Sequence, residues 1–229
     1  MVTIATNKFT DTFVKRVLYV YLLRMPMRQW LISEAIFIVG FLFLHNVPGT
    51  AQPFSFYESS SKGNVFISGT STLHDWDMSL DSFNCSVLVE KQEVNKLVLK
   101  NIIFKTKATN LKSGETGGSL MNSKAYDALK ADEYPVITFT CYSTINVNLT
   151  NNSFQTDIPG DLTIAGVKKE VVINVKGDYK DGKLTVNGVY PITTSDFNVP
   201  TVTVFFGTLE TGNLINVHFE IVLENKQNQ

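Results

Sequence analysis

The sequence predicts an all-β fold, because short strand patterns separated by turn signals fill the chain from Pro53 onward. In Leu214–Leu223 apolar residues alternate with mostly polar ones, which indicates one buried and one solvated face. About ten such segments without a long helix are typical of a β-sandwich or a closed barrel, and composition does not distinguish these. The expected strands are Phe54–Ser60, Asn64–Thr72, Phe83–Glu90, Lys96–Ala108, Val136–Asn148, Phe154–Thr163, Glu170–Tyr179, Lys183–Thr193, Thr201–Phe206 and Leu214–Leu223.

Three short segments mark expected turns between these strands. Lys62-Gly63 and Asp181-Gly182 are candidates for two-residue hairpin turns, because glycine tolerates the positive φ that such turns require. Ala165-Gly166-Val167 is a third expected turn.

One segment departs from the strand pattern. In Ser119–Tyr134 apolar residues recur near helical spacing, Asn122 or Ser123 is a candidate N-cap, and Pro135 ends the pattern. A helix this short is not stable alone, so we expect it to pack on the sheet or to close a barrel end. The glycine-rich Ser113–Gly118 before it is typical either of a gate over a cavity or of an ordinary cap, and we favour the cap.

Residues 1–51 contain the pattern of a secretory signal peptide. Arg28 precedes the apolar run Trp30–Leu44, and small residues follow up to Ala51. The run is shorter than the roughly 20 apolar residues that a membrane span requires. We therefore expect cleavage after Ala51 and no stable membrane span after processing.

Residues 1–24 fit poorly in front of this signal. Our hypothesis is that translation starts at Met25 or Met27 and that residues 1–24 are not part of the precursor. The processed chain, residues 52–229, is then a single β domain. Such processing predicts a periplasmic or secreted protein.

Charge restricts the partners of this domain. From Gln52 onward the sequence has 15 lysines, no arginine and 19 acidic residues, a net charge of −4. A mildly acidic protein has no electrostatic footprint for nucleic acid and is not attracted to an anionic membrane surface. Without arginine, the domain also lacks the bidentate fork that suits phosphate and carboxylate groups.

The sequence offers little evidence for catalysis. His74-Asp75-Trp76 resembles a base beside an acid, but adjacent strand residues point to opposite faces, so we interpret this cluster as a turn whose tryptophan fills a barrel end. No spacing is typical of a metal site, and no nucleophile elbow or cofactor fingerprint occurs. We therefore expect no enzyme activity, no metal and no cofactor.

The two cysteines of the domain, Cys85 and Cys141, both fall on apolar faces of expected strands. In an oxidising compartment they could form a disulfide. As unpaired residues they would be buried small hydrophobes. Sequence does not reveal connectivity, and both alternatives remain.

Four motifs in order match a known family. They are Gly69–Trp76 (GTSTLHDW), Glu133–Phe139 (EYPVITF), Gly160–Lys169 (GDLTIAGVKK) and Thr194–Phe197 (TSDF). With these motifs the chain resembles the YceI-like family of polyisoprenoid-binding proteins, over roughly Phe54–Leu223. The resemblance implies an antiparallel lipocalin-like β-barrel of about eight to ten strands with one short helix capping an end. It also implies an exported protein that holds isoprenoid chains such as polyprenyl compounds or quinones.

A barrel that holds such a chain needs an apolar lining, and inward-facing positions can be chosen by alternation. Plain core packing explains each of these positions as well. The expected lining residues are Val65, Ile67, Phe83, Val87, Ile137, Phe139, Leu162, Ile164, Ile173, Val217 and Phe219. The residues expected to cap a barrel end are Trp76, Met121, Tyr126 and Leu129.

These observations predict an exported carrier whose partner is an apolar small molecule, an isoprenoid or another lipid. The alternative is a structural or adhesion-type periplasmic β domain without a small ligand, which a large exposed apolar patch would favour. A homodimer is also possible, since Leu214–Leu223 as a long exposed edge strand could pair two barrels.

Overall fold

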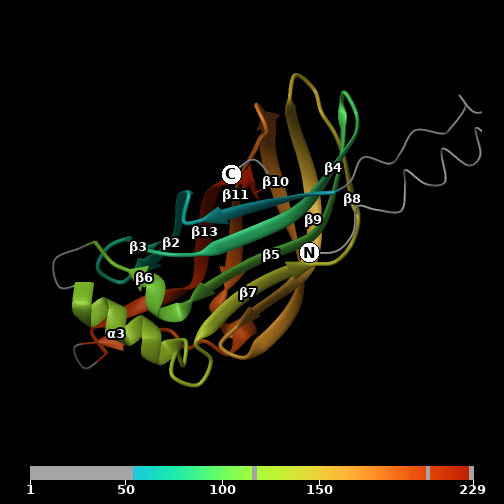
Figure 1. Cartoon of the computed structure of the whole chain (residues 1–229). Coiled ribbons are helices and arrows are strands. Elements are labelled where there is room, and N and C mark those ends of the chain that lie inside the picture. The colour runs from blue at the N-terminus through green and yellow to red at the C-terminus, as the bar shows by residue number, and fades with distance from the viewer. Residues whose placement is uncertain (1–53, 115–117, 205–206, 227–229) are drawn as a thin grey trace, which may run out of the picture. The chain divides into compact units, whose positions relative to one another are not determined.

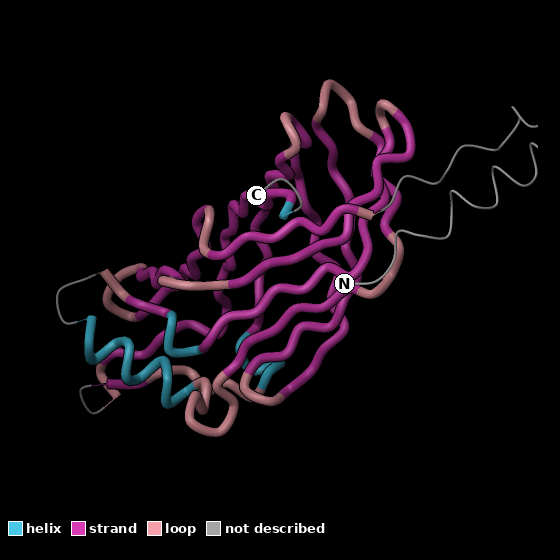
Figure 2. The backbone as a smooth tube through the Cα atoms, viewed as in Figure 1, coloured by secondary structure: helices cyan, strands magenta, loops and turns pink. Residues whose placement is uncertain are grey.

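The computed structural model describes residues 54–114, 118–204 and 207–226, and these form β-strands with one α-helix (Figures 1 and 2). The predicted signal segment and the alternative start sites lie outside the described residues. The strands are β1 Ser55–Ser60, β2 Gly63–Ser71, β3 Trp76–Leu80, β4 Asn84–Glu93, β5 Lys96–Lys107, β6 Leu111–Lys112, β7 Val136–Cys141, β8 Ile145–Asn148, β9 Ser153–Ile164, β10 Val167–Lys180, β11 Lys183–Thr193, β12 Thr203–Val204 and β13 Leu209–Asn225. The helices are α3 Gly118–Ala128 and the 3₁₀ turns η1 Ala108–Asn110 and η2 Thr194–Phe197.

The strands close into an antiparallel barrel, which confirms the expected fold. The order around the barrel is β1-β4-β5-β7-β9-β10-β11-β13, and β13 pairs back to β1. Closure leaves these eight strands without a free edge over their paired lengths. Strands β2, β3 and β6 extend the wall at the end of the barrel where α3 lies (Figure 1).

Strands β1 and β2 are two parts of one bent strand, so the hairpin expected at Lys62-Gly63 is wrong. Both pair with β13, through Glu58↔Glu224 in β1 and Gly63↔Ile221 in β2. Gly63 has a φ of 121° at the bend, a conformation that glycine adopts without steric cost. The bend lets the first part pair with β4 and close the barrel, while the second part pairs with β3.

Two other expected turns are confirmed. Asp181 and Gly182, with φ of 53° and 73°, join β10 to β11, where Lys180 pairs with Lys183. Ala165 and Gly166 make the same kind of turn between β9 and β10. Two positive φ values in a two-residue loop match the right-handed twist of the flanking strands.

Three expectations about single strands need correction. Leu214–Leu223 is not an edge strand, because β13 pairs with β11 on one side and with β2 on the other. The proposed route to a homodimer through this strand is therefore wrong. Val136–Asn148 divides into β7 and β8, both of which pair with β5. Strand Trp76–Leu80 was not expected, because its polar and apolar residues do not make a conspicuous pattern.

Helix α3 is shorter than the expected Ser119–Tyr134. It ends at Ala128, well before Pro135, and a turn follows in which the amide N–H of Tyr134 donates to the carbonyl oxygen of Lys130. Neither Asn122 nor Ser123 caps the helix, because it begins at Gly118 and both residues lie inside it. Asn122 Oδ1 instead accepts from the backbone N–H of Ser113. The helix lies at the barrel end, as expected for a cap (Figure 1).

Candidate ligand-binding cavity

The barrel encloses a cavity of about 520 Å³. Among its lining residues, His74, Leu120 and Pro200 are exposed to solvent and lie at the α3 end, whereas Leu184 and Leu223 at the other end are fully buried. The cavity therefore opens near α3 and is closed at the opposite end. We call the open end the mouth.

Strand register stacks the lining residues in layers from the mouth inward. The outer layer contains Trp76 on β3, Ile215 on β13 and Ile192 on β11. Gly69 of β2 pairs with both Trp76 and Ile215, and Ile215 pairs with Ile192. The remaining layers follow at every second residue, because side chains alternate across a strand. In order they are Met78–Ile67–Val217–Tyr190, Val65–Phe219, Ile221–Val186 and Leu223–Leu184.

Two tyrosines cover the closed end. The hydroxyl groups of Tyr57 and Tyr179 are 2.9 Å apart, and their rings lie 6.2 Å apart from centre to centre. Tyr57 is 2% exposed, and burial together with the Tyr179 hydroxyl raises the pKa of Tyr57. A shared hydrogen bond satisfies both hydroxyls where the apolar interior meets the end of the barrel.

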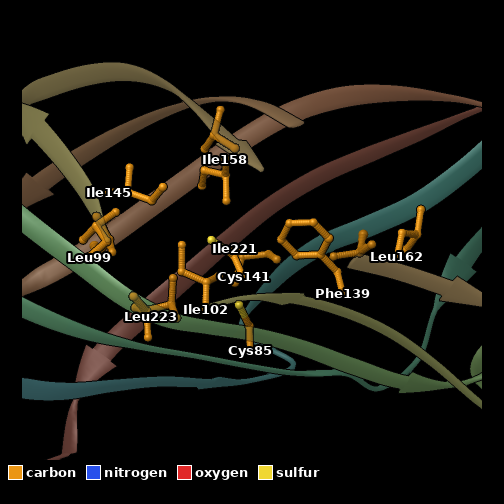
Figure 3. Close-up of a cluster of buried hydrophobic side chains, with 14 of the residues drawn as sticks. Cys85, Leu99, Ile102, Phe139, Cys141, Ile145, Ile158, Leu162, Ile221 and Leu223 are labelled. Atoms are coloured by element: carbon orange, nitrogen blue, oxygen red, sulfur yellow. The ribbon is translucent and has the colours of Figure 1, made fainter. Parts of the chain in front are cut away.

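All the expected lining residues except Phe83 border the cavity. Phe83 is buried, but its ring stacks on Phe104 at 5.7 Å, and Phe104 is the residue that reaches the cavity. Figure 3 shows Phe139 and Leu162 among the interior side chains contributed by several strands. Alternation thus predicts on which face of a strand a residue lies, but not which of two stacked rings borders the cavity.

Among the expected cap residues, Trp76, Met121 and Leu129 line the cavity and Tyr126 does not. The Tyr126 hydroxyl faces β6 instead: it accepts from Lys112 Nζ at 2.8 Å and donates to the carbonyl oxygen of Leu111 at 2.7 Å. This bond pair fastens α3 to the barrel wall, and the opposite face of the helix contributes to the mouth.

Four hydroxyl groups in the cavity wall have hydrogen-bond partners within the protein. Ser71 donates to the carbonyl oxygen of His74, Thr106 donates to that of Ser82, and Thr194 donates to Asn213 Oδ1. Thr211 accepts from the backbone N–H of Val202. These groups are engaged in holding loops and strand ends, and the rest of the wall is dominated by aliphatic and aromatic side chains.

The His74-Asp75-Trp76 cluster is a turn at the mouth. His74 Nδ1 lies 2.6 Å from the carbonyl oxygen of Asp75, and the Trp76 indole N–H donates to the carbonyl oxygen of Thr70 at 2.9 Å. Within the described ranges, no three His, Cys, Asp or Glu side chains are grouped as a metal site would need. The other histidine of the domain, His218, is half-buried, and its ring stacks on Phe66 at 4.4 Å.

Both cysteines are free and buried, so the structure contains no Cys85–Cys141 disulfide. They pair with different positions of β5, Phe104 and Ile102, which keeps them apart along the barrel. Both lie in the interior cluster of Figure 3, and Cys85 lines the cavity. Burial raises the pKa of the Cys85 thiol to about 12, so the thiol stays neutral at physiological pH.

Sequence reasoning missed several lining residues. Met78 belongs to a strand that was not expected. Tyr190 could have been found, since it alternates with Leu184, Val186 and Ile192 in an expected strand and shares their inward face.

Comparison with known proteins agrees with this geometry. The family model described as "YceI-like domain" matches residues 59–223. The chain belongs to the YceI-like domain family. No curated protein matches the sequence.

Solved structures with the same fold confirm the barrel. BcnA of Burkholderia cenocepacia is similar with a TM-score of 0.55 and 20% identity, covering 71% of this chain and 96% of its own. A polyisoprenoid-binding domain from Saccharophagus degradans, implicated in plant cell wall breakdown, is similar with a TM-score of 0.54 and 12% identity, covering 75% and 99%. At these identities the likeness establishes the fold alone.

Proposed function

We propose that this protein is an exported carrier that holds an apolar isoprenoid-type ligand, such as a polyprenyl chain, a quinone or a similar lipid, inside its barrel. The observation that carries the proposal is the internal cavity, whose wall is almost entirely apolar. A volume of about 520 Å³ falls within the range of about 300–1,000 Å³ typical of small-molecule sites. An internal cavity favours a carrier over a purely structural β domain.

Burial of hydrocarbon supplies the binding energy in this proposal. Each CH₂ group removed from water contributes about 0.8 kcal/mol, and a wall of aliphatic and aromatic side chains provides that without hydrogen bonds. The predicted lining residues that border the cavity, such as Ile67, Phe139 and Val217, are the proposed ligand contacts. The protein then acts by holding a ligand and not by chemistry.

The charges near the cavity favour a ligand without a strongly anionic group. Lys124 and His74 line the mouth, and the domain has no arginine from Gln52 onward. Most of the charge of a pyrophosphate group would have no matched hydrogen-bond donor in this cavity. A quinone, a prenol or an acyl chain does not bring such a charge.

Export is part of the proposal and rests on the signal pattern that ends at Ala51. In the described part of the chain, no helix has the length and apolar character needed to cross a membrane. Membership of the YceI-like domain family, together with the similar fold of a solved polyisoprenoid-binding domain, supports the ligand class.

A matched pair of substitutions tests the site. Val217 points into the cavity beside Tyr190, whereas Val189, one residue along from Tyr190 on β11, is 54% exposed. In protein beginning at Gln52, Trp76 at the mouth is the single tryptophan, so quenching of its emission by a short-chain quinone reports binding.

Val217→Phe places a ring in the cavity and is expected to weaken quinone binding at least about tenfold, while Val189→Phe leaves it unchanged. Equal binding by both variants would mean that the ligand lies elsewhere. Thermal unfolding of both variants checks that they remain folded.

A further inference from the structure

Tyr190 is the exception among the hydroxyl groups of the cavity wall. Ser71, Thr106, Thr194 and Thr211 all have protein partners. Among the described residues, Tyr190 lines the cavity and its hydroxyl makes no hydrogen bond. The tyrosines at the barrel ends differ in this respect, since Tyr57 and Tyr126 both bond through their hydroxyls.

This unpartnered donor has a defined place. Tyr190 pairs with Val217, and its layer includes Ile67 and Met78. That layer is two residues inside the one formed by Trp76 and Ile192, a separation of roughly 7 Å along a strand. Deeper layers contain apolar residues alone as far as Leu184 and Leu223, where the cavity ends.

An apolar ligand that fills this cavity removes water from the Tyr190 hydroxyl. A ligand of hydrocarbon alone would leave the hydroxyl without a partner, which weakens binding, because an unmade hydrogen bond in an apolar site is costly. A ligand with an oxygen acceptor at that level satisfies the hydroxyl and gains affinity.

We propose that Tyr190 determines ligand specificity by donating a hydrogen bond to an oxygen of the ligand, so that the carrier selects oxygen-bearing isoprenoids such as ketones and quinones over pure hydrocarbons. The oxygen then lies near the mouth and the chain extends toward Leu184 and Leu223. This inference rests on the proposed function, because it names the ligand class of the same cavity.

Two probes with the same chain test the inference. They are farnesylacetone, an isoprenoid ketone, and the hydrocarbon in which a methylene group replaces its carbonyl. Competition with the fluorescent apolar dye N-phenyl-1-naphthylamine gives the Kd of each. Tyr190→Phe removes the hydroxyl alone, and Tyr142→Phe is the matched control, because Tyr142 is 70% exposed and does not line the cavity.

The expected result is a ketone Kd about three- to tenfold higher in Tyr190→Phe, the range of one neutral hydrogen bond, with hydrocarbon binding unchanged or tighter. Tyr142→Phe changes neither value. If the wild-type protein binds both probes and Tyr190→Phe shifts them equally or not at all, the inference about Tyr190 is overturned and the carrier function stands. Failure of the wild-type protein to bind either probe or the dye would overturn the carrier function itself.

Discussion

Replacing Gly63 with alanine tests the bend between β1 and β2, because the added methyl group would clash with the backbone of β13. A Cβ added there would lie 2.9 Å from the backbone carbonyl carbon of Glu220 on β13 and would overlap its oxygen. The φ of 121° is also a conformation that L-residues rarely adopt. Gly63→Ala must therefore move β2 away from β13 at the point where the barrel closes.

The expected loss of stability in Gly63→Ala follows from the clash and from the strained backbone. Strained backbone costs about 1–3 kcal/mol, and separating the strands weakens neighbouring ladder bonds worth about 0.5–1.5 kcal/mol each, so we expect a loss of about 4 kcal/mol. For a domain of this size, that lowers Tm by about 8–16 °C. Gly182→Ala is the control: its φ of 73° is positive too, but no atom lies within 4 Å of an added Cβ.

We expect Gly182→Ala to cost only about 1–2 kcal/mol, through backbone strain alone. Calorimetry or circular dichroism measures both Tm values, and urea unfolding gives the two free energies. If the two variants lose the same stability, the contact between Gly63 and Glu220 does not constrain the barrel and the reasoning about closure is wrong.

Three further predictions concern the closed end and the buried thiol. Tyr57→Phe loses the bond to Tyr179, so unfolding free energy should fall by about 1 kcal/mol, and dye affinity should not change because Tyr57 does not line the cavity; altered affinity would contradict the assigned end. The pKa of Cys85 rises from 9.0 to about 12 on folding, so above pH 9 the thiol loses its proton in the unfolded protein but keeps it in the folded protein. The free energy of unfolding therefore falls as pH rises, by up to about 1.4 kcal/mol per pH unit. In urea titrations Cys85→Ala should show a shallower fall between pH 9 and 10, and an unchanged slope would refute this. The same shift makes the thiolate about a thousandfold scarcer at pH 8, so labelling of Cys85 by Ellman's reagent should be correspondingly slow in the folded protein and fast in denaturant.

Local signals in the sequence predicted much of this fold because they depend on near neighbours. The turns at Gly166 and Gly182 follow from residues that tolerate positive φ, and the inward faces of strands such as Leu214–Leu223 follow from alternation. Strand partners are different, since they depend on residues distant in sequence. Gly63 was therefore assigned to a hairpin, although it lies at a bend in one continuous strand that pairs with β13. Leu214–Leu223 was assigned to an edge, although strands pair with it on both sides.

The candidate site was predictable to the same degree. Alternation correctly placed Val217 and Phe139 on the inward faces of their strands, and both line the cavity. It could not show that Phe104 stands between Phe83 and the empty space, or that Tyr126 turns its hydroxyl toward Lys112. These details depend on which side chains from separate strands meet, and sequence spacing contains no information about that.

Native mass spectrometry of protein purified from its own host, followed by lipid extraction, tests the central claim most directly. We expect a single defined adduct whose mass corresponds to an oxygen-bearing isoprenoid. Val217→Phe, which blocks the cavity, should lose this adduct, and Val189→Phe should keep it. Protein that carries no lipid and also takes up no added quinone or prenol would contradict the proposed carrier function.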